Sequence, residues 1–226
     1  MKRKITILSD ATFVAILVLL TFFAVKQDLL FAKTPQPVQD SSNVTATTLV
    51  EEFHNLLIKS MKMGDKSTCS ERFHFLSPFI EKGFDFALIS KIVLGRRHWK
   101  QMDEKTREKF IEAFTKMTVA TYARRFDSYS GQRFETVGSK PDRRGHYIVD
   151  AVLIKKDGDR IDFRYICKKV NGTWKIVSVS AKGVNDLSVK RADYNSFLKK
   201  HSIQELIEKL IEKAGLCLGK NKSNTK

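Results

Sequence analysis

The sequence predicts an α+β domain whose helices pack on one face of a four-stranded antiparallel meander. Two changes of pattern along the chain indicate this fold class. Apolar residues recur at helical spacing up to about residue 130, alternate with polar residues over about 132–182, and return to helical spacing after 187. Helices, then consecutive strands, then helices again are typical of α+β domains with the helices segregated to one side of the sheet.

Composition and charge narrow the class of protein. With 226 residues, 42% apolar and 29% charged, the chain can bury a core, and its three cysteines are too few for a disulfide-stapled miniprotein. Lys and Arg number 41 against 25 Asp and Glu, a net charge of +16 that suits nucleic acid and anionic membranes about equally. The basic residues are spread along the chain, and no zinc-finger spacing or RNA-binding aromatic motif is present, which disfavours nucleic acid.

The N-terminus resembles a signal peptide. Lys2, Arg3 and Lys4 precede an uncharged apolar run over 11–25, which is signal-peptide length and short for a membrane span. We expect a signal peptide over 1–32 and an exported protein; an uncleaved anchor, which would make the chain a membrane-tethered interaction module, is the alternative. An extracytoplasmic compartment offers much lipid and little nucleic acid, so an anionic membrane surface is the expected partner.

A polar segment separates the apolar N-terminus from the folded part. Residues 33–44 contain two prolines and show no periodicity, so they predict a linker. A single domain is expected over residues 45–215, and residues 216–226 are expected to form a flexible tail.

Helical spacing marks the first part of the domain. It predicts a first helix over 45–63. Residues 70–101 hold a dense apolar set interrupted by Pro78, Gly83 and Gly95, so we expect short helices packed at different angles.

The longest helix is predicted for residues 104–130. Asp103 is placed to cap its start, and Gly131 to end it. The stripe of large or apolar side chains on this helix consists of Phe110, Phe114, Met117, Thr121, Tyr122, Phe126 and Tyr129. The helix is therefore expected to bury one face.

The alternation of apolar and polar residues after Gly131 then predicts the sheet. Strands are expected near residues 132–139, 145–156, 159–170 and 173–182. Asp157-Gly158 and Asn171-Gly172 lie between strand patterns and are strong signals for tight hairpin turns. Two further helices are predicted, near residues 187–200 and 203–214.

The sequence carries no recognisable catalytic or cofactor motif. HExxH, CxxC, nucleophile-elbow and phosphate-loop patterns are absent, so no metal and no cofactor are expected. Each histidine is expected at the surface or at an interface; they are His54, His74, His98, His146 and His201. Cys167 alternates in register with Phe163 and predicts a buried free thiol, whereas Cys69 and Cys217 could pair, although the sequence does not say which two cysteines join.

Asp150 is the candidate for an enzymatic alternative. A carboxylate among apolar strand residues could act as a general base in a closed cavity, as in small isomerases that lay a helix on a curved sheet. Strand alternation places Asp150 on the face opposite Val149 and Ala151, so it is solvated if those two face the core. An isomerase or hydrolase is thus the second hypothesis.

The chain has sixteen phenylalanines, more than a small core obviously needs. Core packing is one interpretation. The other is a partly unfilled interior between the helices and the concave sheet, where an apolar ligand could bind.

Residues 79–135 resemble the MlaC or toluene-tolerance auxiliary family of periplasmic lipid carriers. The positions that carry this resemblance are Phe84, Asp85, Phe86, Leu94, Gly95, Arg96, Trp99, Thr121, Tyr122, Ala123, Tyr129, Ser130 and Gly131. It continues through 174–176 and 182–184 and covers roughly residues 48–212. The sequence of residues 122–134 also resembles the hopanoid-associated HpnM branch of the same superfamily, so a hopanoid is the alternative cargo.

The resemblance implies a non-enzymatic protein that shuttles phospholipids across the periplasm. Its implied partners are an outer-membrane lipoprotein complex and an inner-membrane ABC transporter, and its implied role is to keep the outer membrane asymmetric. A two-tailed lipid exposes about thirty methylenes worth about 0.8 kcal/mol each, so a carrier must enclose the tails in a lipid cavity.

Two sets of candidate site residues follow. We expect the lipid cavity to be lined by Phe84, Phe86, Ile89, Val93, Phe114, Tyr122, Val149, Phe163 and Tyr165. A basic side chain near an anionic surface contributes about 1 kcal/mol of attraction. Candidates for contact with the membrane or the headgroup, each of which could equally be hydrated surface, are Arg96, Arg97, Arg124, Arg125, Arg143 and Arg144.

Overall fold

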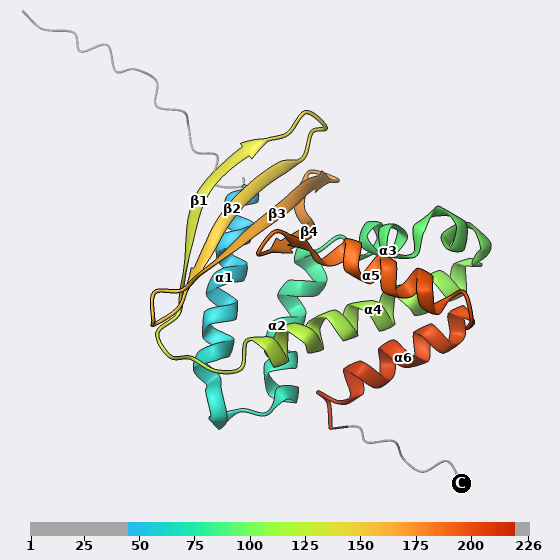
Figure 1. Ribbon diagram of the computed structural model, residues 1–226, viewed down its shortest axis with the longest axis horizontal. Helices are drawn as coiled ribbons and strands as arrows, with labels where there is room; N and C mark the ends of the chain where they lie inside the picture. The colour runs from blue at the N-terminus through green and yellow to red at the C-terminus, as the bar shows by residue number, and fades with distance from the viewer. Residues whose placement is uncertain (1–44, 220–226) are drawn as a thin grey trace, which may run out of the picture. The chain divides into compact units, whose positions relative to one another are not determined.

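The computed structural model describes residues 45–219, and the predicted signal peptide, the linker and residues 220–226 lie outside them (Figure 1). Helices α1 (Ala46–Met63), α2 (Cys69–Gly83), α3 (Phe86–Gln101) and α4 (Glu104–Arg125) come first, with a 3-10 turn η1 (Gly64–Lys66) after α1. The strands are β1 (Arg133–Pro141), β2 (Tyr147–Ile154), β3 (Arg160–Val170), β4 (Thr173–Ala181) and β5 (Val184–Asn185). Helices α5 (Asp186–Phe197) and α6 (Ile203–Gly215) follow. The α+β class is confirmed.

The sheet is an antiparallel meander in the order β1-β2-β3-β4-β5. The four predicted strands are present, and the sheet has a fifth strand, β5, that the sequence did not predict. Strand β5 has two residues, which pair with Ser180 and Ala181, and so short a strand shows no alternation in the sequence. The predicted hairpin at Asn171-Gly172 forms with positive φ at both residues, as a tight turn between right-twisted strands requires.

The three interruptions expected between residues 70 and 101 behave differently, and Gly83 is the last residue of α2. Pro78 lies inside α2 and does not divide it. A capping box at Thr68 starts this helix, and Phe73 and Ile80, on either side of the proline, are both buried, which keeps both halves aligned. Gly95 has φ 74 and interrupts α3, as predicted.

Helix α4 ends at Arg125, five residues before the predicted end. Phe126 leaves helical geometry with φ −116 and ψ 60, and its carbonyl accepts a 3.0 Å hydrogen bond from the Ser60 hydroxyl of α1. Its ring is buried, whereas Tyr129, predicted on the buried stripe, is 42% exposed. The chain turns here because Phe126 packs in the core ahead of β1.

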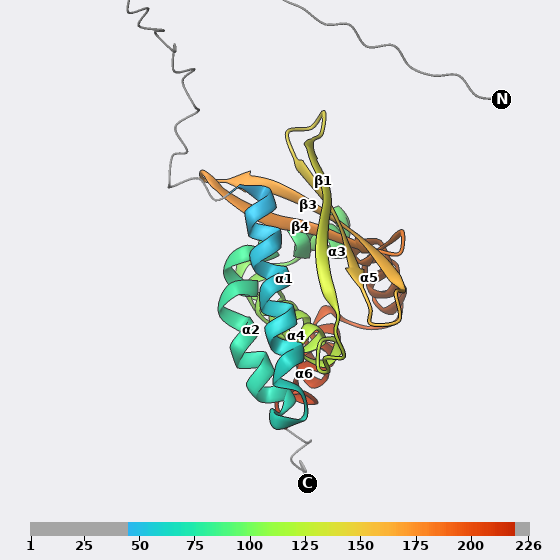
Figure 2. The ribbon, with the colours of Figure 1, turned by 90° about the vertical axis from the view of Figure 1, so that its left-hand side faces the viewer.

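The main core lies between the sheet and the helices (Figure 2). On β2 the residues Val149, Ala151 and Leu153 face this core, as the alternation predicted. Helix α1 contacts β1 to β4, while α4 packs against both α2 and α6.

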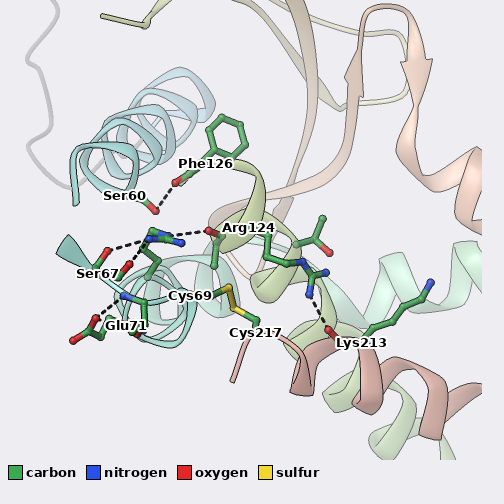
Figure 3. Close-up of a disulfide and its surroundings, with 12 residues drawn as sticks. Ser60, Ser67, Cys69, Glu71, Arg124, Phe126, Lys213 and Cys217 are labelled. Carbon is green, nitrogen blue, oxygen red and sulfur yellow. Dashed lines mark hydrogen bonds between the residues drawn. A yellow bond between two sulfur atoms is a disulfide. The ribbon is translucent and has the colours of Figure 1, made fainter. Parts of the chain in front are cut away.

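A disulfide joins Cys69, at the start of α2, to Cys217, just after α6 (Figure 3). The two cysteines are 148 residues apart in sequence. Residues 216–219, expected to begin the flexible tail, are therefore tied to the helices at Cys217, which is buried. Cys167 is a buried free thiol, as predicted, and burial raises its pKa to about 12.

Two arginines support the same end of the molecule through backbone carbonyls. The buried Arg72 donates from Nε to the Ala123 carbonyl of α4 (3.0 Å) and from Nη1 to the carbonyls of Gly64 (3.1 Å) and Ser67 (2.7 Å). Arg124 donates to the Lys213 carbonyl of α6 at 2.9 Å (Figure 3). The Ala123 and Lys213 carbonyls lie in the last turns of α4 and α6, so the arginines supply donors where the helices provide none.

Candidate functional site

A pocket lies where α3, α4 and α5 approach β4. Five of the nine predicted lining residues line it: Phe84, Phe86, Ile89, Phe114 and Tyr122. The other lining residues are Thr118, Ser178, Val179, Asp186 and Leu187.

Local structure explains how the aromatic residues reach the pocket. The Asp85 backbone N–H donates to the Ile176 carbonyl of β4 at 3.0 Å, and the Asp85 carboxylate caps α3 by accepting from the Leu88 N–H, also at 3.0 Å. Phe84 and Phe86 flank Asp85, so this junction directs both rings inward. On α4 the lining residues Phe114, Thr118 and Tyr122 follow at intervals of four and share one helix face.

The free space in this pocket is about 20 Å³. That is close to the volume needed by a single water, whereas pockets for drug-sized ligands measure about 300–1,000 Å³. The open lipid cavity expected here is instead a narrow pocket between closely packed rings.

Four predicted lining residues lie off the pocket. Val93 and Val149 are fully buried in the core, while Phe163 and Tyr165 lie on β3 and pack against each other with ring centroids 6.1 Å apart. For the two β3 residues helix α1 accounts for the difference, because its Phe53 contacts Tyr165 and also the pocket rings Phe84 and Tyr122. Strand alternation shows which residues face inward, and it does not show which helix covers them.

A continuous path of ring contacts nevertheless joins the two groups, and we call it the aromatic seam. Its members are Phe163, Tyr165, Phe53, Tyr122, Phe84, Phe86 and Phe114. Neighbouring centroids are 5.1 to 6.5 Å apart, within the range of favourable aromatic pairs. The seam therefore extends from β3 to the pocket, with Phe53 of α1 at its centre.

His54 is buried beside the seam. Its Nε2 lies 3.0 Å from the Tyr165 hydroxyl, and its ring stacks on Phe134 with centroids 4.0 Å apart. Burial lowers the pKa of His54 from 6.5 to about 4. The prediction that every histidine lies at the surface or an interface is wrong for His54, because α1 packs against both α2 and the sheet and so buries a wider face than one stripe.

The pocket lining carries one carboxylate, Asp186, at the first position of α5. Lys190 donates to both of its oxygens, at 2.6 and 2.5 Å. Burial and the nearby Asp186 raise the pKa of Tyr122 well above its usual value. Aromatic and aliphatic side chains together thus form most of the lining, and an ion pair marks one side of it.

Asp150 lies away from the pocket. Its two carboxylate oxygens accept from Arg164 Nε and Nη2 at 2.6 and 3.0 Å, on the face of the sheet opposite Val149. This agrees with the interpretation of Asp150 as a solvated strand residue. The isomerase or hydrolase hypothesis loses its candidate base.

The six predicted arginines form three separate exposed pairs. Arg96 and Arg97 follow Gly95 in α3, Arg124 and Arg125 end α4, and Arg143 and Arg144 lie in the β1–β2 turn. None of the six lines the pocket. The structure therefore does not bring them together into one headgroup site.

A second pocket of about 310 Å³ lies between the end of α3, the start of α4 and the link from α5 to α6. It is lined by His98, Gln101, Met102, Asp103, Thr106, Leu198, His201, Ile203 and Gln204. No sequence pattern indicated it, because its residues come from two stretches about ninety residues apart, 98–106 and 198–204. Its largely polar lining does not suit acyl chains.

Residues 45–219 hold no group of three or more His, Cys, Asp or Glu side chains placed to bind a metal ion. Over the same range, every helix is too short or too polar to cross a bilayer.

Comparisons with known proteins give a family and a fold relative. The phospholipid-binding protein from Ralstonia solanacearum, whose structure was solved in complex with a phospholipid, superposes with a TM-score of 0.66 at 16% identity. The match covers 76% of this chain and 98% of that one, and it shows a shared fold. No curated protein matches the chain. The sequence model of the MlaC protein family matches residues 48–212, most of the domain described above, and the chain therefore belongs to the MlaC family.

Proposed function

We propose that this protein is a non-enzymatic periplasmic carrier that binds phospholipid acyl chains between its helices and its sheet. In this proposal it moves lipid between the outer membrane and an inner-membrane ABC transporter. Membership of the MlaC family supports the role, and the fold shared with a protein in complex with a phospholipid supports the ligand class.

The observation that carries the proposal is the pocket at the end of the aromatic seam. Rings and aliphatic side chains from three helices and one strand converge there, and they meet one ion pair, Asp186 with Lys190, at one side. An apolar lining with a polar group at one side matches a molecule that has tails and a headgroup.

Binding requires the pocket to widen. Empty apolar volume costs about 24 cal/mol per Å³, so an opening of about 300 Å³ costs about 7 kcal/mol unless it is filled. Each methylene that enters the opening contributes about 0.8 kcal/mol, and roughly nine methylenes offset that cost. We therefore expect the pocket to open together with the entry of acyl tails.

The opening is expected where α3 and α5 meet β4. Helices α2, α4 and α6 are tied by the disulfide and by the two arginines, Arg72 and Arg124. By contrast, α3 and α5 are hydrogen-bonded to β4 only at their starts, through the Asp85 N–H and the Asn185 side chain, among the bonds of the described residues. Beyond those starts their pocket side is lined by apolar side chains such as Phe86 and Leu187. When the pocket opens, acyl chains can replace the contacts that these side chains lose.

Mass spectrometry of organic extracts from the purified protein tests the proposal and identifies the cargo. Phospholipid in the extract is the expected result, and a hopanoid would place the protein in the HpnM-like alternative. If the delipidated protein takes up neither lipid from vesicles, the carrier function is wrong.

A matched pair of variants tests the location of the site. Thr118→Phe places a ring in the pocket and should abolish lipid uptake, whereas Thr115→Phe, on the same helix but off the pocket lining, should leave uptake unchanged. Circular dichroism and urea unfolding check that both variants fold, since overpacking costs about 1–3 kcal/mol. Equal uptake by the two variants would show that acyl tails bind elsewhere.

A further inference from the structure

Two hairpin turns lie at the same end of the sheet, the β1–β2 turn after Pro141 and the β3–β4 turn after Val170 (Figures 1 and 2). The strand register joins them, because Tyr147 pairs with Cys167 on β3 and Lys168 pairs with Lys175 on β4. We call residues 140–147 and 168–175 together the hairpin end.

The hairpin end is strongly basic. Its basic residues are Lys140, Arg143, Arg144, Lys168, Lys169 and Lys175. Asp142 is its only acidic residue, and its carboxylate is used within the turn, accepting from the backbone N–H groups of Arg144 and His146 at 2.8 Å. An uncompensated positive surface therefore remains.

This charge works against the stability of the sheet. Lys168 and Lys175 lie directly opposite each other, and like charges in that position destabilise a strand pair. Lys175 donates to the Lys82 carbonyl, but neither Lys168 nor Lys169 forms an ion pair with any described residue. A local arrangement that costs stability is a common mark of a functional surface.

Two aromatic rings accompany the charges. Tyr147 and Trp174 are half-buried with their ring centroids 5.7 Å apart, and the Lys169 ammonium lies 5.8 Å from the Trp174 centroid. Tyr and Trp next to basic residues are typical of protein surfaces at the level of lipid headgroups, since their rings combine an apolar body with a polar tip. A purely soluble anion would gain little from these rings.

We propose that the hairpin end docks on an anionic membrane surface, with its lysines and arginines against lipid phosphates and Trp174 at the headgroup level. The usefulness of this contact rests on the proposed carrier function, because a carrier must meet the membrane that supplies or receives its lipid. The contact itself does not require the pocket. Of the three predicted arginine pairs, this proposal uses only Arg143 and Arg144; the other two pairs lie on α3 and α4.

Co-sedimentation with vesicles tests the proposal. The purified protein should bind vesicles of phosphatidylglycerol mixed with phosphatidylcholine, bind pure phosphatidylcholine weakly, and lose binding as salt rises. The double variant Lys168→Glu/Lys169→Glu should bind the anionic vesicles at least tenfold, and by the usual attraction per basic residue roughly thirtyfold, more weakly.

The control is Lys199→Glu/Lys200→Glu, which makes the same change of charge in the link between α5 and α6. It should bind like the unmodified protein. Equal weakening in both variants would assign binding to net charge, and no weakening in the hairpin variant would assign it to another surface; either result overturns the proposal.

The lipid content of the same preparations separates this proposal from the carrier function. If the hairpin variant keeps its lipid and loses vesicle binding, both proposals stand. If lipid is present and vesicle binding is unchanged by the variant, docking at the hairpin end is wrong and the carrier function stands. If no preparation contains or takes up lipid, the carrier function fails whatever the vesicles show.

Discussion

Two regions of the molecule, the disulfide-bonded ends of the helices and the aromatic seam, are held together by different kinds of interaction. We call the end with the Cys69–Cys217 disulfide, Arg72 and Arg124 the stapled end. There the contacts are covalent or directed at particular carbonyls. In the aromatic seam the contacts are between rings, and each ring such as Phe53 or Phe84 touches several others.

This difference determines where the molecule can open. A hydrogen bond from a charged group contributes about 1.5–3 kcal/mol, and its carbonyl acceptor cannot be replaced by a lipid tail. A ring pair contributes about 0.5–1.5 kcal/mol beyond burial, and an acyl chain can replace most of that packing. We therefore expect lipid to enter at the seam while the stapled end keeps its structure.

Removing the disulfide should have the largest effect on stability. The disulfide closes a loop of about 150 residues, for which the loss of chain entropy in the unfolded state predicts about 5 kcal/mol. Urea unfolding of Cys69→Ser/Cys217→Ser measures this, and reductant should reproduce it in the unmodified protein. If the free energy of unfolding falls by less than about 1 kcal/mol, the disulfide is not a main support of the stapled end.

Arg72→Met should lower the free energy of unfolding by about 3 kcal/mol. The change leaves carbonyls at Ala123, Gly64 and Ser67 without their buried donor. Arg107→Met is the matched control, because Arg107 donates one part-buried hydrogen bond, to the Trp99 carbonyl, and lies over the Trp99 ring at 5.5 Å; it should cost about 1–2 kcal/mol. Similar losses in the two variants would remove the special role of Arg72.

Acid should weaken the seam in particular. The pKa of His54 is about 4 in the folded protein against 6.5 when unfolded, so the unfolded state binds a proton first as pH falls. The stabilisation is therefore complete above pH 6.5 and decreases by about 3 kcal/mol as pH falls to 4. His54→Gln, which can still hydrogen-bond Tyr165, should reduce the pH dependence over that window in urea unfolding. An unchanged slope would mean that His54 titrates normally.

The smallest expected effect on stability comes from the seam side chains themselves. Phe86→Leu should cost about 1 kcal/mol, because the smaller side chain loses ring contacts with Phe84 and Phe114 but stays apolar. Lipid uptake should nevertheless change, in amount or in preferred chain length, when measured with vesicles of defined acyl composition. A variant with normal stability and unchanged uptake would weaken the assignment of the pocket.

Much of the fold could be predicted because its signals are local. Alternation over β2 identified Val149 and Ala151 as inward-facing, and the Asn171-Gly172 turn set a hairpin. The early end of α4 at Arg125 was missed, because it depends on where Phe126 packs in the core and on its bond to Ser60. Contacts of that kind join residues far apart in the chain and leave no periodic trace.

The sequence by itself determined the α+β class, the resemblance to the MlaC family and which residues of β2 share a face. Five of the residues that it predicted for a lipid cavity lie on the pocket lining. Only the tertiary structure decided that Cys69 pairs with Cys217, that His54 is buried, and that Phe53 contacts both Tyr165 and the pocket rings. The physical reason is that periodicity reports the environment of one helix or strand at a time. Which elements then meet, and how much space they leave, depends on the packing of every side chain between them.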